Sequence, residues 1–411
     1  MYIRMITNAI KRDFPIFAHQ PDLVYLDSAA TTLKPASVIA KSIEYYEEYS
    51  ANIARGLYAL SEKATIEYEK TREMTAQFIH AASSSEIIFT RGTTESINLL
   101  SYSLESHIHE GDEILVTVAE HHSNFLPWQA LAERKKAVLK ILEIDSDGQF
   151  RLDTLLQLIT PRTKIFAFGY ISNVLGTINP VADSITQAKA LNPDIITVVD
   201  AAQAMAHVAI DVQQLDCDFL AFSAHKMFGP TGVGVLYGKL ALLESLPPFQ
   251  YGGEMVLEAK REHSTFKNSP HKFEAGTPNI AGVIAFQEAL SYIQSLGFES
   301  IHNHEQEMLG YAVAKLETTF GNTLHIFGTR NISQRSGVIA FSLDGIHPHD
   351  IAQMLSEKNI CIRAGQHCTA PLHDSLHLPV TARLSVSIYT THEDIDVFVS
   401  TLQDIQTTFG K

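Results

Sequence analysis

Short apolar runs alternate with longer amphipathic stretches through the middle of the chain. The runs are rich in valine, isoleucine and phenylalanine and are too short for most helices, so they predict buried strands. These predicted strands cover residues 113–118, 164–170, 195–199, 219–223 and 233–237. Helical segments lie between several of them, at residues 124–136 and 152–159. Such alternation is typical of an α/β fold with a buried, mostly parallel sheet.

The pattern changes after roughly residue 290, where strands and helices no longer alternate in the same way. The pattern predicts strands at 336–343, 359–363 and 383–389, and helices at 347–358 and 393–409. We therefore expect three parts. They are an N-terminal segment at 1–20 that packs on the small domain, a large domain at 21–290, and a smaller α+β domain at 291–411.

Composition narrows the range of partners. The chain of 411 residues carries a net charge of −15, which argues against a sequence-independent grip on nucleic acid and against an anionic membrane surface. No apolar stretch is long enough to span a membrane, and the N-terminus lacks the features of a signal peptide. Three cysteines do not suggest a disulfide framework, so we expect a reducing compartment, the cytoplasm. We assign no metal ligands.

Lys226 and Asp200 carry the most informative chemistry. Lys226 ends Ser-Ala-His-Lys after one predicted strand, and Asp200 ends the apolar strand before it. A lysine amine can form a Schiff base with an aldehyde, and a buried aspartate needs a cationic or hydrogen-bonding partner. A protonated pyridine would be such a partner, although Asp200 could also be an ordinary capping residue. The pair predicts a pyridoxal 5'-phosphate (PLP) cofactor.

Further polar residues follow other predicted strands. Thr94 opens a helix whose start could bind a phosphate, or it is part of an ordinary helix cap. His121 could stack on a flat ring, and Asn173 could donate to the ring oxygen or to a substrate carboxylate. A polar loop histidine and a turn asparagine are the alternatives.

Three more candidates lie beside the first pair. Gln203 could reach the ring oxygen, and Ser223 and His225 could bind the phosphate. Ligands of open α/β sheets bind at the carboxyl ends of the strands, so the whole set is expected to meet at one edge.

Eight segments make the chain resemble the fold-type I, class V aminotransferase-like PLP enzymes, and more narrowly the Suf-type (group II) cysteine desulfurases. In chain order they occupy residues 26–32, 91–95, 120–124, 172–177, 200–203, 223–226, 273–278 and 363–368. The resemblance implies a large PLP-binding domain, and a small domain that carries a loop with a catalytic cysteine.

The resemblance also implies a role for each candidate residue. Lys226 would be the Schiff-base lysine, His121 the stacking residue, Asp200 the partner of the ring nitrogen, and Gln203 the partner of the ring oxygen. Thr94, Ser223 and His225 would hold the phosphate, with Thr277 completing that site from the neighbouring subunit of a homodimer. Arg383, assisted by Arg363, would clamp the substrate carboxylate, and Asn173 would lie near it.

Cys368 lies in a glycine-containing loop flanked by histidine. By the same resemblance, its thiolate would attack the sulfur of L-cysteine, keep that sulfur as a persulfide and release alanine. Lys226 would shuttle the proton, with His121 as a second proton donor. The sulfur would pass to a SufE- or SufU-like acceptor protein for iron–sulfur cluster assembly.

Three positions depart from the family pattern: Ala54, Tyr58 and Gln366 stand where histidine is common. Other readings therefore stay open, namely selenocysteine lysis, cysteine sulfinate desulfination and transamination, because those substrates share the amine and carboxylate of cysteine. A non-catalytic sulfur carrier that has kept the fold is a further alternative.

Overall fold

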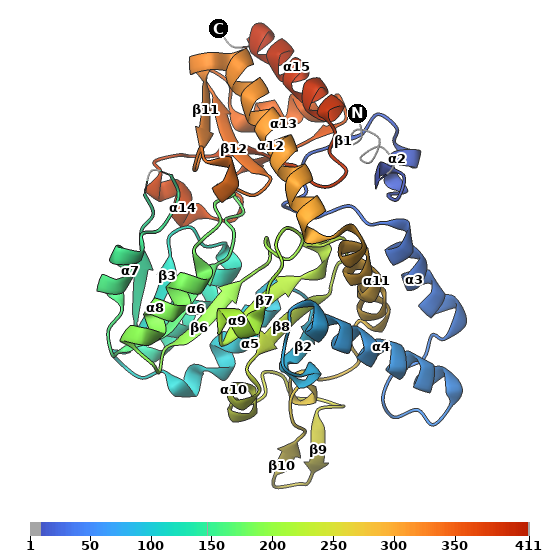
Figure 1. Ribbon diagram of the computed structural model, residues 1–411. Helices are drawn as coiled ribbons and strands as arrows, with labels where there is room; N and C mark the ends of the chain where they lie inside the picture. Colours follow the sequence, from blue (N-terminus) through green and yellow to red (C-terminus); the bar gives the residue numbers. More distant parts are fainter. Residues whose placement is uncertain (1–9, 146, 410–411) are drawn as a thin grey trace.

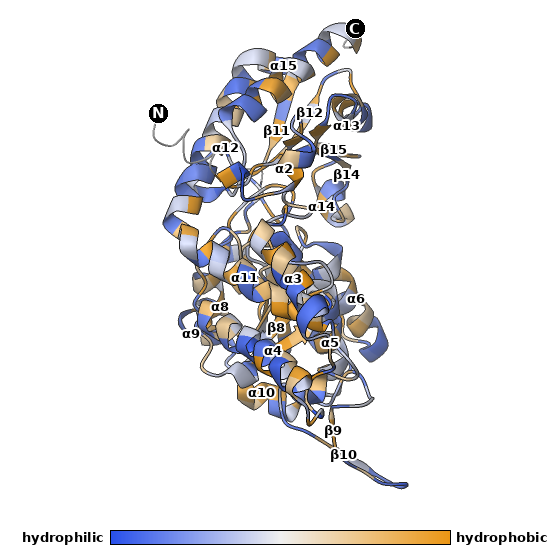
Figure 2. Ribbon diagram, turned by 90° about the vertical axis from the view of Figure 1, so that its right-hand side faces the viewer, coloured by the Kyte–Doolittle hydropathy of each residue, from blue (hydrophilic) through white to orange (hydrophobic). Residues whose placement is uncertain are grey.

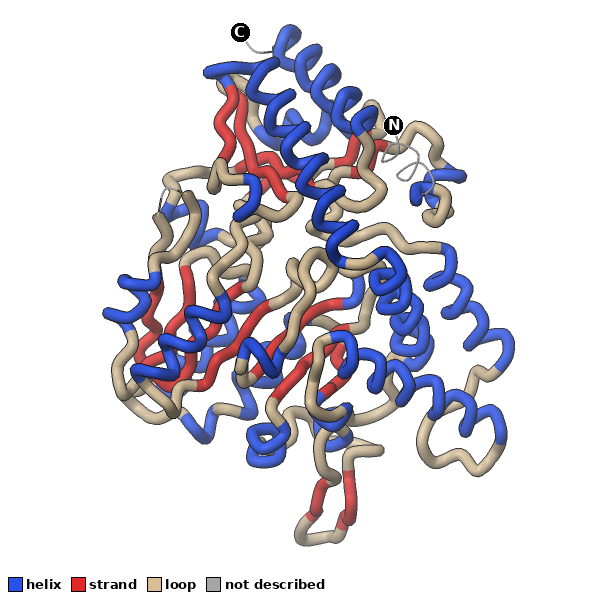
Figure 3. The backbone as a smooth tube through the Cα atoms, in the orientation of Figure 1, coloured by secondary structure: helices blue, strands red, loops and turns tan. Residues whose placement is uncertain are grey.

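The computed structural model describes residues 10–145 and 147–409, and these residues fold around two separate β-sheets (Figure 1). One sheet has seven strands and the other has four, and the two lie at opposite ends of the long helix α12 (Figure 3). Residues 1–9 of the predicted N-terminal segment lie outside the described residues. Among the described residues, no helix combines the length and hydropathy needed to cross a membrane.

The seven-stranded sheet confirms the predicted mostly parallel core. Its strand order is β2-β8-β7-β6-β5-β3-β4, and only β8 runs antiparallel to its neighbours. The strands are β2 (Ile87–Thr90), β3 (Glu113–Thr117), β4 (Val138–Leu142), β5 (Thr163–Gly169), β6 (Ile196–Asp200), β7 (Phe219–Ser223) and β8 (Gly234–Gly238).

Helices cover both faces of this sheet, because alternate side chains of each strand point to opposite faces. In β5, Phe166 and Phe168 join one buried core, whereas Ile165 and Ala167 join another. The first core is closed by α3 (Ala36–Glu48), α4 (Ala59–Phe78), α8 (Val181–Leu191), α9 (Val212–Leu215) and α11 (Ile280–Leu296). The second is closed by α5 (Thr93–Ser103), α6 (His122–Lys135) and α10 (Leu240–Ser245). Helix α7 (Leu152–Leu158) adds Leu155 to the first core.

The four-stranded sheet is antiparallel in the order β11-β12-β15-β14 and has its own core. Its strands are β11 (Leu324–Phe327), β12 (Val338–Leu343), β14 (Arg363–Gly365) and β15 (Thr381–Ser385). Its helices are α12 (Phe298–Phe320), α13 (Pro348–Ser356), α14 (Ala370–Ser375) and α15 (His392–Phe409). The strand predicted at 383–389 is wrong after residue 385, because the chain turns there to place Tyr389 against Phe14.

Two small strand pairs complete the fold. Strand β1 (Val24–Tyr25) pairs in parallel with β13 (Ile360–Cys361), so the predicted strand at 359–363 divides into β13 and β14. Strands β9 (Val256–Ala259) and β10 (Ser264–Phe266) form a hairpin that extends away from the body in two perpendicular views (Figure 1, Figure 2).

The first described residues contact both halves of the molecule. Phe14 packs on Phe228 and Tyr292, whereas Lys11 forms a 2.8 Å ion pair with Asp394 of α15. The short helix α2 (Ile16–His19) follows. Helix α11 stays in the core of the large sheet through its last turn, so we propose that the two domains divide at Gly297, between α11 and α12.

Candidate active site

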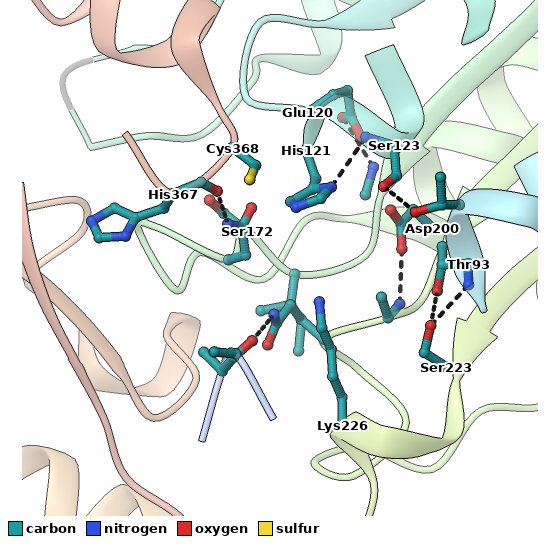
Figure 4. Close-up of a pocket in the computed structure, with 18 of the residues that line it drawn as sticks. Thr93, Glu120, His121, Ser123, Ser172, Asp200, Ser223, Lys226, His367 and Cys368 are labelled. Atoms are coloured by element: carbon teal, nitrogen blue, oxygen red, sulfur yellow. Dashed lines mark hydrogen bonds between the residues drawn. The ribbon is translucent and has the colours of Figure 1, made fainter. Parts of the chain in front are cut away.

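A cavity of about 390 Å³ opens where the large sheet faces the four-stranded sheet (Figure 4). Eleven of the residues singled out by sequence line it, and they come from both halves of the chain. They are Thr94, His121, Asn173, Asp200, Gln203, Ser223, His225, Lys226, Arg363, Cys368 and Arg383. Thr277 does not: it lines a second cavity together with Arg91 and Gly232.

The topology explains why these residues meet. Strands β2, β3, β5, β6 and β7 point in the same direction, so their carboxyl ends lie along one edge. His121 follows β3, Asn173 follows β5, and Asp200 and Ser223 end β6 and β7. Lys226 closes the single 3₁₀ turn Ala224–Lys226 that follows β7. The cavity therefore lies where open α/β sheets bind their ligands.

The surroundings of the Lys226 amine favour its neutral form. Burial lowers its pKa to about 8, an effect opposed by Asp200 and reinforced by Arg383. No hydrogen bond from this amine to another described residue is present. A larger share of this amine is therefore neutral near pH 7 than for an ordinary lysine.

Asp200 offers a buried carboxylate to the cavity. One of its oxygens accepts a 2.9 Å hydrogen bond from the Ala202 amide. Burial raises the pKa of this carboxyl above its usual range, so it favours a cationic partner. A protonated ring nitrogen has the required charge.

His121 caps helix α6 and is held in one orientation. Its Nδ1 accepts a 3.1 Å hydrogen bond from the Ser123 amide. Burial and the nearby charge of Lys226 lower the pKa of His121 to about 3, so the ring is neutral at pH 7. The remaining ring proton then lies on Nε2, which is free to donate.

Hydroxyl groups gather at the N-terminus of α5, where free backbone amides favour an anion. The Ser223 Oγ lies 2.8 Å from the Thr93 amide nitrogen, and Thr94 Oγ1 lies 2.6 Å from Ser123 Oγ. Ser223 thus organises Thr93 at the helix start, while Thr94 and Ser123 present their hydroxyls to the cavity. This arrangement suits a phosphate group.

Two amide side chains have structural partners within the site. The Gln203 Nε2 donates to the Ala29 carbonyl at 2.7 Å, and the Asn173 Nδ2 donates to the His367 carbonyl at 2.9 Å. Asn173 therefore connects the loop after β5 to the loop that carries Cys368.

Arg363 and Arg383 lie directly opposite each other on β14 and β15. Both guanidinium groups share the carboxylate of Asp27, with distances of 3.0 and 3.1 Å. Arg383 also donates to the Asn173 carbonyl at 2.9 Å, and its buried Nε has no hydrogen-bond partner among the described residues. The two guanidinium groups carry one more positive charge than the Asp27 carboxylate neutralises. The arginine pair can therefore bind a further carboxylate.

Cys368 is the exposed thiol at the rim of the cavity. It and His367 both adopt left-handed backbone conformations, with φ of 58° and 50°. Cys217 is buried in the core, and burial raises its pKa to about 12. Cys361 is half-buried, and its pKa is also raised. Of the three cysteines, Cys368 is therefore the accessible thiol at the cavity.

A family model described as aminotransferase class-V matches residues 24–398. The chain belongs to this family. The chain is 44% identical over 410 residues, covering 99% of both chains, to a probable cysteine desulfurase of Halalkalibacterium halodurans. It is 41% identical over 406 residues, covering 98% of both, to a cysteine desulfurase of Yersinia pseudotuberculosis.

Solved structures agree with the fold of this chain. An apo cysteine desulfurase from Thermococcus onnurineus superposes with a TM-score of 0.94 at 34% identity, covering 98% of this chain and 99% of that one. A cysteine desulfurase of Escherichia coli superposes with a TM-score of 0.89 at 37% identity and the same coverage. The predicted fold-type I architecture is confirmed.

Two acidic residues of the site were not assigned a role from the sequence. Asp27 follows β1 and pairs with the two arginines, and Glu120 is the buried residue that precedes His121. Glu120 accepts hydrogen bonds from Thr117, Asn124 and Gly169, and burial raises its pKa to about 7. Both lie within segments that carry the family resemblance. The arginine partners of Asp27 and the Gly169 partner of Glu120 are distant in sequence.

The three departures from the family pattern lie outside the residues that line the described cavity. Gln366 precedes the cysteine loop, and its carbonyl accepts hydrogen bonds from both the amide and the hydroxyl of Thr369. Ala54 has a left-handed φ of 74°, and Tyr58 is 55% exposed at the start of α4. None of these three side chains therefore forms part of the cavity wall.

Proposed function

We propose that this chain is a PLP-dependent cysteine desulfurase that converts L-cysteine to L-alanine. One observation carries the proposal: the exposed Cys368 thiol lines the same cavity as the Lys226 amine and the paired arginines. The curated relatives at 41 and 44% identity, which match nearly the whole chain and carry this name, support it.

The residues present fit PLP. Lys226 supplies a buried amine of lowered pKa, Asp200 a buried carboxylate, and the start of α5 a cluster of amides and hydroxyls. When bound, PLP supplies an electron-withdrawing ring that makes the substrate α-proton removable and weakens the bond to its sulfur.

Arg383 and Arg363 are proposed to bind the α-carboxylate of the substrate. Asp27 holds both guanidinium groups in place, and the unpartnered Nε of Arg383 is available to a new acceptor. A carboxylate fixed at this end directs the rest of a small amino acid toward Lys226 and Cys368, because all of these groups line one cavity.

Lys226 is proposed to move protons at the substrate carbons. A group with a pKa of about 8 can both accept and release a proton near neutral pH. His121 has a free Nε2–H and lines the same cavity, so it is the second candidate donor.

Cys368 is proposed to take the sulfur. Its thiolate attacks the substrate sulfur, so a new S–S bond forms while the bond between that sulfur and the β-carbon breaks. The β-carbon gains a proton and leaves as part of alanine. The sulfur remains on Cys368 as a persulfide, and a thiol acceptor then removes it.

The lowered pKa of Lys226 predicts how PLP uptake depends on pH. Only the neutral amine attacks an aldehyde, so its fraction rises about tenfold per pH unit up to about pH 8 and then levels off. The rate at which visible absorbance appears when PLP is added to the apoprotein should follow this curve. A rate that keeps rising toward pH 10 would show an ordinary lysine.

Replacing Arg383 with lysine should raise the KM for L-cysteine by about tenfold or more, with a smaller effect on kcat. A lysine cannot contact Asn173, Asp27 and a carboxylate together in a fixed plane. Steady-state kinetics with L-cysteine tests this, and exposed Arg151, which pairs with Asp153 on the surface, gives the control substitution Arg151→Lys. An unchanged KM in the Arg383 variant would contradict the carboxylate-binding role.

We further propose the Suf-type (group II) subgroup, a homodimer, and a SufE- or SufU-like acceptor in the cytoplasm. Thr277 supports the dimer, because it lies outside this chain's own cavity and beside Arg91 at a second one. A neighbouring subunit could bring Thr277 to the phosphate. Sulfur delivered to such an acceptor would serve iron–sulfur cluster assembly. Sedimentation of the purified protein tests the dimer.

The function itself is tested by incubating the purified holoenzyme with L-cysteine and a thiol reductant. Desulfurase chemistry gives alanine and sulfide in equal amounts over many turnovers. Formation of a keto acid together with pyridoxamine phosphate would instead show transamination. No alanine above a control with PLP alone would refute the proposal for the isolated chain.

A further inference from the structure

The loop that carries Cys368 is fastened to the start of helix α6 by a single residue, His122. The His122 amide donates a 2.7 Å hydrogen bond to the Cys368 carbonyl. In the other direction, the Ala370 amide donates to the His122 Nε2 at 3.1 Å. His122 thus contacts the loop on both sides of Thr369.

The loop needs such a fastening because two consecutive residues in it are strained. His367 and Cys368 both have positive φ, which side chains larger than glycine rarely adopt. The carbonyl of each has one donor from outside the loop, Asn173 for His367 and His122 for Cys368. Surrounding structure must supply the free energy that keeps this conformation populated.

The His122 backbone amide acts as a donor to Cys368, whereas its ring acts as an acceptor for Ala370. Ala370 is the first residue of α14, where a backbone N–H has no acceptor within its own helix. The ring nitrogen supplies that acceptor. His122 itself does not line the cavity, whereas Glu120, His121 and Ser123 do. His122 therefore contacts the cysteine loop and not the space that a ligand would occupy.

We propose that His122 is a positioning residue for Cys368, and that its ring acceptor fixes the side of the loop that follows the thiol. The acceptor requires an unprotonated Nε2, and burial lowers the pKa of His122, which favours that form. The part of this proposal that concerns sulfur transfer rests on the proposed function.

Two substitutions separate the ring acceptor from the bulk of the side chain. In His122→Gln the amide oxygen can reach the place of Nε2, whereas in His122→Asn the shorter side chain cannot. The backbone donor to Cys368 is kept in both. In holoenzyme without substrate, hydrogen exchange of the Ala370 amide should be about tenfold faster in His122→Asn and near wild type in His122→Gln.

The same variants then test positioning. Single-turnover release of alanine from L-cysteine should be about tenfold to a hundredfold slower in His122→Asn, with little change in KM. His122→Gln should recover most of the rate. PLP absorbance should be unchanged in both, since neither variant alters the cavity wall.

The exchange and single-turnover results test the two parts of the proposal separately. Equal exchange at Ala370 in wild type and His122→Asn would overturn the fastening, and faster exchange with an unchanged single-turnover rate would overturn the positioning role. If the wild-type enzyme itself releases no alanine, the proposed function fails. The exchange measurement alone then decides whether His122 holds the loop.

Discussion

Replacing Lys226 with alanine should lower alanine production from L-cysteine by at least about 10³-fold. The variant loses the amine that attacks the cofactor aldehyde and the group that moves protons at the substrate carbons. Both tasks depend on the same buried nitrogen, whose pKa burial lowers to about 8. Alanine measured at saturating L-cysteine reports the effect, and bound PLP is quantified separately.

Lys34 offers a matched control for this experiment. It is another largely buried lysine whose pKa burial lowers to about 8, but its amine donates to the backbone carbonyls of Thr32 and His225 and does not line the cavity. Lys34→Ala should keep most of the activity. Near-normal turnover in Lys226→Ala would refute its assignment, and equal losses in both variants would show that the effect is not specific.

Replacing Cys368 with alanine should reduce sulfur release from L-cysteine to below about a hundredth of the wild-type rate. The arginines and Lys226 are untouched, so L-cysteine should still perturb the PLP absorbance at a similar concentration. The contrast separates substrate binding from sulfur transfer. It follows from Cys368 being the exposed thiol of a loop at the cavity, while Arg383 is buried on β15.

Cys361 provides the control, since it is a half-buried thiol in β13 that does not line the cavity. Cys361→Ala should turn over at close to the wild-type rate. Sulfide release at the wild-type rate in Cys368→Ala would remove the persulfide step from the mechanism. The rate of selenocysteine turnover should depend less on Cys368, because selenium leaves carbon more readily than sulfur does.

Strands β3, β5, β6, β7 and β8 of the large sheet could be predicted because they are short apolar runs that are almost fully buried. Strand β4 escaped prediction because it lies at the sheet edge, where Val138 is 46% exposed and Lys140 interrupts the apolar run. The β9–β10 hairpin escaped because its strands are only four and three residues long and are largely exposed. Whether such segments form strands depends on their position in the fold more than on their local sequence pattern.

The site residues that could be predicted from the sequence are those that follow predicted strands or lie within the motifs of the family resemblance. Asp27 escaped because its partners, Arg363 and Arg383, lie in the last part of the chain and meet it only when β1 pairs with β13. The contact of His122 with the cysteine loop is equally distant in sequence. Thr277 lies apart from the cavity, so its predicted role needs a second chain.

The most direct test of the account is to find where the substrate sulfur goes. Holoenzyme is treated with L-cysteine without reductant, and the peptide that contains Cys368 is analysed by mass spectrometry alongside released alanine. The account predicts that this peptide gains the mass of one sulfur atom, in proportion to the alanine formed, and loses it on reduction. Alanine formed while Cys368 stays unmodified and the sulfur appears elsewhere would contradict it.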